Sequence, residues 1–221
     1  MEFQKKSAFH SLFKPKLIGI FYLIVFITSI ILGILYIELL GVFILGAILL
    51  GVLLLIFLVV MLIQLSKIEI IWDIQTINPE GNTGKVFVVF RPGITDFQER
   101  MIDAFLQGLI KNDWAVDITS ASSKTPYKID QYDLLVLGMP TYGGLPHQTI
   151  LDFLDILGDL NGKRTALIVT AMGSDEARKA LENKVRNANG IIAESLTVYN
   201  MKENKENPRD ICYKAGRNIK A

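Results

Sequence analysis

The chain contains an apolar run of 49 residues, Leu17–Leu65, that carries a single charged side chain, Glu38. At about 1.5 Å per residue, one helix of this length would measure roughly 73 Å, more than twice the ~30 Å hydrocarbon core of a bilayer. The run is therefore expected to form a transmembrane helical hairpin. Its two spans are expected at about residues 17–37 and 39–65, with the turn near Glu38.

The charges beside the run predict its orientation. Residues 1–16 form a basic tail with four lysines and one glutamate, and Lys67 follows the second span. Basic flanks stay in the cytoplasm, so we expect a multi-pass cell-membrane protein whose following domain is cytoplasmic. A cleavable secretory signal is the alternative. It fits poorly, because the run is far longer than the apolar region of a signal, which has about 7–15 residues.

Charge and cysteine content limit what the rest of the chain can do. From Ser66 onward, 19 Lys and Arg residues stand against 20 Asp and Glu residues, which gives no electrostatic basis for binding nucleic acid. The single cysteine, Cys212, excludes an internal disulfide and a CxxC site. Only two histidines are present, which excludes a histidine-rich metal site, so no metal is expected. No nucleophile–base pair stands out.

Residues 66–84 are expected to form a linker, since they end in a run of turn-forming residues, and residues 85–221 to form one domain. In that domain, apolar β-rich runs alternate with helical patterns. The sequence thus predicts an α/β domain with a five-stranded parallel doubly wound sheet. The expected strands are Val86–Phe90, Trp114–Ile118, Leu134–Leu137, Ala166–Val169 and Ile191–Tyr199. Four helices are expected: one after the capping box Thr95–Gln98, one from about His147, one with Ser174 as its N-cap, and one that opens at Asn207-Pro208.

Three loops rich in Gly, Pro or Thr follow strands of this sheet: Arg91–Asp96, Met139–Pro146 and Thr170–Ser174. Doubly wound sheets bind ligands beyond the carboxyl ends of their strands, where the strand order reverses. The loops are therefore expected to form one binding site.

The second loop carries the most specific motif. Residues 134–144 read LLVLGMPTYGG, which resembles the strand and G-x-P-x-Y-x-G segment of flavodoxin-like domains, and the resemblance covers about residues 85–221. It implies that FMN binds with its phosphate in the first loop and its isoalloxazine ring against the other two. The implied cofactor-binding residues are Arg91, Gly93, Ile94, Thr95, Pro140, Thr141, Tyr142, Gly143, Gly144, Ala171, Met172 and Gly173. The resemblance implies no catalytic side chain.

The first loop departs from the pattern of that family. The family usually has a Ser/Thr-x-Thr-Gly-Asn-Thr run, whose hydroxyls and N–H groups surround a phosphate at a helix N-terminus. Here Gly93 and Thr95 match, but the first hydroxyls and the Asn are absent. Pro92 removes a donor, and Asp96 adds negative charge unless Arg91 offsets it.

Several of these residues also have a purely structural explanation. Gly93 could serve a tight turn with positive φ, and Thr95 could cap the following helix in a capping box with Gln98. His147 is expected to be a solvated residue of a first helical turn, not a general acid. Ordinary loop conformation or packing is the alternative for Tyr142, Gly143, Gly144, Met172 and Gly173.

Two functions follow from this sequence. The first is a membrane-anchored flavodoxin-like protein that binds FMN and carries electrons at the cytoplasmic membrane surface. Its partners would be the lipid bilayer and an unidentified redox partner in the membrane, and one- and two-electron chemistry are not distinguished. The second is a non-catalytic docking or scaffold domain that keeps the fold and has lost FMN. The departures at Arg91, Pro92 and Asp96 favour the second.

Overall fold

The computed structural model describes residues 15–35, 40–67, 69–141, 143–201, 204 and 206–220. The chain divides into two compact units, Met1–Ile68 and Glu69–Ala221. The expected turn at Glu38, most of the basic tail and the site residue Tyr142 lie outside the described residues.

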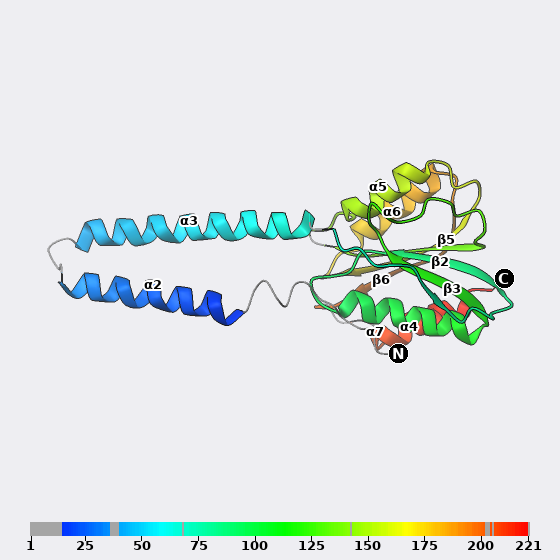
Figure 1. Ribbon diagram of the computed structural model, residues 1–221, viewed down its shortest axis with the longest axis horizontal. Coiled ribbons are helices and arrows are strands. Elements are labelled where there is room, and N and C mark those ends of the chain that lie inside the picture. Colours follow the sequence, from blue (N-terminus) through cyan, green and yellow to red (C-terminus); the bar gives the residue numbers. More distant parts are fainter. Residues whose placement is uncertain are drawn as a thin grey trace. The chain divides into compact units, whose positions relative to one another are not determined.

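The first unit contains two apolar helices, α2 (Pro15–Leu35) and α3 (Leu40–Lys67) (Figure 1). Within the described part of the chain, one stretch, Ile44–Met61 in α3, is long and apolar enough to cross a membrane, judged by length and composition alone. The apolar stretch of α2, Gly19–Leu32, is shorter than the ~20 residues that a crossing requires. One candidate span is therefore found where the sequence predicted a pair.

The second unit is built on a six-stranded sheet with the order β1-β3-β2-β4-β5-β6. The strands are β1 (Gln75–Ile77), β2 (Gly84–Phe90), β3 (Trp114–Ser120), β4 (Leu134–Pro140), β5 (Arg164–Ala171) and β6 (Ile191–Tyr199). The five predicted parallel strands are confirmed, but the predicted number of strands is wrong. The sixth strand, β1, pairs antiparallel with β3 and lies in the stretch that was expected to be linker. With three residues, two of them exposed, β1 is too short to show an apolar pattern.

Helices cover both faces of the sheet (Figure 1). They are α4 (Phe97–Lys111), α5 (Gln148–Leu157), α6 (Glu176–Asn187) and α7 (Pro208–Asn218). Val86 and Val88 of β2 belong to a buried cluster with α4 and α7, whereas Phe87 and Val89 belong to a second cluster with α5 and α6. Because strand positions buried on both faces need apolar residues, residues 86–90 of β2 form a continuous apolar run.

Helices α4 and α7 meet backbone to backbone through two glycines. A Cβ on Gly216 would lie 2.1 Å from the carbonyl oxygen of Phe105, and a Cβ on Gly108 would lie 2.3 Å from that of Tyr213. Any larger residue at either position must push the two helices apart.

Gly216→Ala should therefore lower the free energy of unfolding by about 1–3 kcal/mol, the usual cost of overpacking. Urea unfolding followed by the fluorescence of Trp72 and Trp114, both in this unit, measures it. Gln107→Ala, on the exposed side of α4, is the control and should change stability by less than about 0.5 kcal/mol. Equal stability of the two variants would contradict this account of the α4–α7 contact.

Candidate functional site

The carboxyl ends of β2, β4 and β5 lie side by side, because β2 pairs with β4 and β4 with β5 in parallel register. Backbone hydrogen bonds continue just beyond the strands. The N–H of Arg91 donates to the carbonyl of Gly138 (2.8 Å), and that of Thr141 donates to the carbonyl of Thr170 (2.8 Å). The next two strands in chain order, β3 and β4, pair with opposite sides of β2, so the strand order reverses there. The three predicted loops thus leave the sheet at its switch point.

Gly138 and Gln98 form the floor beneath these loops. A Cβ on Gly138 would lie 2.5 Å from Cδ1 of Ile102 and 3.0 Å from the side-chain amide of Gln98, so glycine allows α4 to approach β4. Gln98 is 1% exposed, and its amide is 2.6 Å from Oγ1 of Thr170. With the amide nitrogen donating to Thr170, its oxygen also accepts from the N–H of Met139 (3.1 Å). Sequence reasoning missed this bridge between α4, β4 and β5.

The predicted capping box at Thr95 and Gln98 is wrong. Helix α4 begins at Phe97, its N-cap is Asp96, and no side-chain cap bond forms there among the described residues. The hydroxyl of Thr95 is 3.5 Å from the N–H of Phe97, at the outer limit of a hydrogen bond. The side chain that should complete the box is the buried Gln98. The start of α4 therefore lacks the reciprocal capping that the sequence suggested.

The proposed positive φ at Gly93 is also wrong, since this glycine is not among those with positive φ. A Cβ there would instead lie 2.8 Å from the carbonyl oxygen of Thr95. Glycine at this position allows the loop backbone to fold closely on itself. Around it, Arg91 and Pro92 are buried, whereas Ile94 is 65% exposed.

The partner of Asp96 differs from the one expected. Nη2 of Arg100 is 3.5 Å from Oδ1 of Asp96, and both side chains are more than half exposed. Arg91 is only 6% exposed, and its charge acts on His147 at the start of α5. The residue that offsets Asp96 is therefore Arg100, one helical turn later. The Arg100–Asp96 pair contributes little to stability, because both side chains are exposed to water.

The second loop turns through two glycines in the left-handed region. Gly143 has φ +82° and Gly144 has φ +80°, which strains any other residue. No described atom lies within 4 Å of a Cβ built on Gly143, so this backbone borders open space. Pro140 ends β4, and Thr141 is buried directly behind the turn.

His147 closes the second loop and is half buried, not solvated as predicted. Its Nδ1 accepts from the N–H of Thr149 (3.3 Å), which makes it the N-cap of α5, and its own N–H contacts Sδ of Met139 (3.3 Å). Burial, with a smaller contribution from the charge of Arg91, lowers the pKa of His147 to about 4. At neutral pH this side chain is therefore an uncharged cap.

The third loop presents an apolar side chain beside an open glycine. Ala171 ends β5, and its carbonyl accepts from the N–H of Asn200 (3.0 Å). Met172, the next residue, is 52% exposed, and no described atom lies within 4 Å of a Cβ built on Gly173. Beyond them, Oγ of Ser174 accepts from the N–H of Glu176 (3.2 Å).

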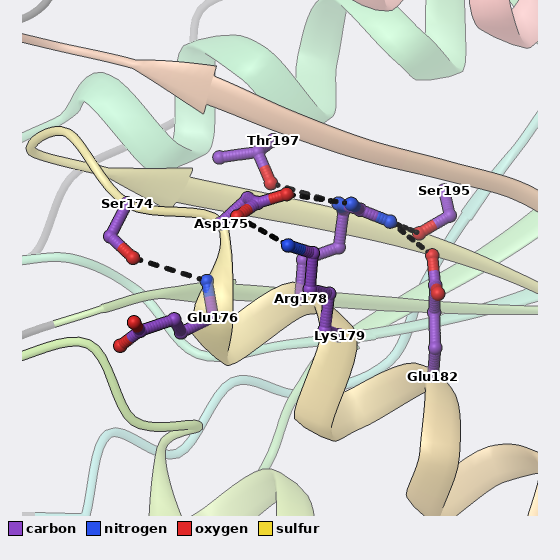
Figure 2. A network of polar contacts seen from close by, with 8 residues as sticks. All are labelled: Ser174, Asp175, Glu176, Arg178, Lys179, Glu182, Ser195 and Thr197. Atoms are coloured by element: carbon purple, nitrogen blue, oxygen red, sulfur yellow. Dashed lines mark hydrogen bonds and ion pairs between the residues drawn. The ribbon is translucent and has the colours of Figure 1, made fainter.

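An arginine network fixes the far end of the third loop (Figure 2). Nη2 of Arg178 donates to Oδ2 of Asp175 (3.0 Å), and its Nε donates to Oγ1 of Thr197 on β6 (3.1 Å). Arg178 also pairs with Glu182. Lys179 is 3.2 Å from Asp175, and hydrogen bonds from Lys179 and Arg178 lower the pKa of that carboxyl group. The network joins α6 to β6 and so holds the start of α6 in place.

The three loops present apolar side chains, two glycines and a helix N-terminus at one edge of the sheet. Ile94 and Met172 are exposed apolar side chains on the loops that flank the Gly143–Gly144 turn. The N-terminus of α4, with Thr95 exposed beside it, offers N–H groups and a hydroxyl to an anion. The residues fit FMN, although the phosphate end relies on backbone N–H groups more than on hydroxyls. Among the described residues, no cluster of His, Cys, Asp or Glu could hold a metal ion.

Comparison with known proteins shows the fold. No protein-family model and no curated protein matches the sequence. A flavodoxin from the domain Archaea matches with a TM-score of 0.52 at 16% identity, over 61% of this chain and 95% of that chain. The two-electron reduced flavodoxin of Megasphaera elsdenii matches with 0.51 at 20% identity, over 60% and 98%. The flavodiiron core of Flv1 from Synechocystis sp. PCC6803 matches with 0.53 at 19% identity, over 63% of this chain and 36% of that chain. The second unit thus has the flavodoxin-like fold.

His147 should titrate well below an ordinary histidine. Because its folded pKa of about 4 lies below the unfolded value of 6.5, the neutral side chain stabilises the fold above pH 6.5. This contribution is lost as the pH falls from about 6.5 through about 4. NMR titration of the ring, assigned with His147→Gln, should give a midpoint near 4, and the urea-unfolded chain should give one near 6.5. A midpoint near 6.5 in the folded chain would contradict the burial described here.

Proposed function

We propose that this protein is a membrane-anchored electron carrier that binds FMN at the carboxyl ends of β2, β4 and β5. The observation that carries the proposal is the meeting of the three loops at the switch point of a flavodoxin-like sheet. FMN, when bound, would supply reversible one- or two-electron chemistry. The protein would bind the group, orient it and control its access to water.

The ring of FMN would lie against the second and third loops. Met172 and Ile94 would contact its apolar faces, and the Gly143–Gly144 turn would let the backbone approach its edge. Tyr142 is proposed to stack on the ring, as the sequence motif implies. The buried residues at the strand ends, Pro140, Thr141 and Ala171, would act by fixing where each loop begins.

The phosphate of FMN would bind at the start of α4. The close fold of the loop at Gly93 and the exposed hydroxyl of Thr95 support this position. The partial positive charge of the helix N-terminus favours a dianion, whereas Asp96 opposes it. The pairing of Asp96 with Arg100 reduces that opposition.

The membrane anchor would be α3, whose Ile44–Met61 stretch meets the length and composition of a span. We propose that α2, with 21 residues, forms a second span, so that both flanks and the domain lie in the cytoplasm. An anchored carrier meets redox partners that are themselves in the membrane, so the expected partner is a membrane-bound redox protein or quinone.

One observation favours a second candidate function, a docking domain without FMN. Arg91 and Pro92 are buried at the place where flavodoxin-like domains usually present hydroxyl groups. If the first loop cannot hold a phosphate, the fold would remain as a tethered binding module.

The full chain, purified in mild detergent, should bind FMN saturably, with one FMN per chain and quenching of the flavin fluorescence. Thr95→Val removes the hydroxyl and should weaken FMN binding about tenfold, as expected from losing one hydrogen bond to a charged group (~1.5 kcal/mol). Riboflavin, which lacks the phosphate, should bind the unmodified protein and Thr95→Val with equal affinity.

Thr76→Val is the matched control, because Thr76 is an exposed threonine of β1, away from the three loops. It should leave the affinities for both flavins unchanged. If the folded protein takes up neither flavin, FMN binding is rejected and the docking function is favoured. If Thr95→Val weakens the binding of FMN and of riboflavin equally, the assignment of Thr95 to the phosphate is wrong.

Single cysteines should reveal the proposed topology in intact cells. Cys212 is buried and its pKa is raised to about 12 by burial, so it should not react with a membrane-impermeant maleimide. In a Cys212→Ala background, Glu38→Cys should be labelled from outside, whereas Ser7→Cys and Gln107→Cys should be labelled only after permeabilisation. Labelling of Ser7→Cys from outside would reject the second span, and labelling of Gln107→Cys from outside would reject a cytoplasmic domain.

A further inference from the structure

Four loops at the carboxyl ends of the strands each expose one large apolar side chain. Ile94, Leu145, Met172 and Met201 follow β2, β4, β5 and β6, and they are 65%, 71%, 52% and 73% exposed. We call these loops, together with the loop after β3 and residues 69–72, the carboxyl rim. Among the described residues of the domain, six large apolar side chains are more than half exposed, and four of them lie on this rim. The other two, toward the opposite edge of the sheet, are Ile156 and Ile191.

The chain enters the domain at the same edge. The ring of Trp72 packs edge-on against Phe90, the last residue of β2, with 5.1 Å between ring centroids. The backbone N–H of Trp72 donates to Oγ of Ser120, the last residue of β3 (2.8 Å). The backbone carbonyl of Trp72 accepts from Oγ1 of Thr119 (2.8 Å). Oγ of Ser120 donates in turn to the carbonyl of Ile70 (2.5 Å). These bonds fasten residues 70–72 across the ends of β2 and β3.

The fastening begins at the first residue of this unit. The carboxylate of Glu69 accepts from the hydroxyl of Ser123 (2.9 Å) and from its N–H. In the sequence, only Ile68 separates Glu69 from Lys67, the last residue of α3. Two residues of extended chain measure about 7 Å. The sequence therefore leaves only a short connection between the last residue of α3 and the first residue attached to the rim.

The side chains of the rim suit the boundary between lipid and water. The loop after β3 exposes Lys124, Tyr127 and Lys128, a mixture of aromatic and basic residues typical of membrane interfaces. Asp96 and Glu176 are exposed on the same rim, so its net charge gives little attraction. Contact with a membrane would depend on the four exposed apolar side chains that follow the strands at this edge.

We propose that the carboxyl rim is a lipid-contacting surface, with Leu145 and Met201 in the interfacial layer of the bilayer. The inference rests on the membrane anchor of the proposed function and is independent of FMN. It deepens that function, because a flavin bound at this rim would face carriers held in the membrane and not carriers in solution.

The test uses the full chain in phosphatidylcholine nanodiscs. In a Cys212→Ala background, an environment-sensitive fluorophore is attached to the cysteine of Leu145→Cys, Met201→Cys or Ile191→Cys. Ile191 is the matched control, because it is 56% exposed and apolar but begins β6 at the opposite edge. Lipids with doxyl groups on their chains should quench the probes at 145 and 201 at least twofold and leave the probe at 191 unchanged. High salt should not abolish the effect.

Three fluorescence results would overturn the proposal. The first is equal fluorescence with and without doxyl lipid at positions 145 and 201, and the second is equal quenching at all three positions. The third is quenching that disappears when each disc holds a single chain, which would indicate contact between copies. Urea unfolding of each labelled protein verifies that it is folded. FMN binding is measured on the same discs, so loss of FMN binding with rim quenching retained rejects only the cofactor. Failure of the chain to enter the discs rejects the anchor and this inference together.

Discussion

The parallel register of β2, β4 and β5 is the constraint on which the rest of the domain depends. It aligns Phe90 with Gly138 and Gly138 with Ile168, so the three strands reach the same edge together. Gly138 has no Cβ to hold α4 away, and Gln98 can therefore cross from α4 to β5 beneath the loops. The three loops begin from one rigid floor, which is the property that a binding site on loops requires.

Much of this arrangement could be predicted from the sequence, because strands buried on both faces must be apolar throughout. The strand Ile191–Tyr199 has the predicted bounds, and the helix after Asn207 begins as expected, with the Asn207 side chain accepting from the N–H of Arg209 (2.9 Å). β1 could not be predicted, since it is short, mostly exposed and held by its neighbour. Sequence patterns describe burial along the chain, and they do not reveal pairing at an edge.

The sequence indicated where the three loops lie better than it indicated the contacts that their side chains make. The loops follow from the alternation of strands and helices, but the direction of each side chain depends on its neighbours in space. Gln98 fits a capping box by spacing, yet it turns inward because Met139 and Thr170 present polar groups there. Arg91 is likewise buried, and Arg100 takes its expected role beside Asp96. Residues 70–72, which follow α3 closely in the sequence, are attached to the ends of β2 and β3 by hydrogen bonds and ring packing, at the edge proposed to carry the rim and the flavin site.

Hydrogen–deuterium exchange with and without FMN reports where on the chain a ligand acts, and so tests whether the three loops form one flavin site. Saturating FMN is expected to slow amide exchange in residues 91–99, 141–147 and 171–176 together, and to leave the amino-terminal ends of the strands unchanged. Protection confined to other segments, or no change in a folded sample at saturating FMN, would contradict a single flavin site formed by the three loops.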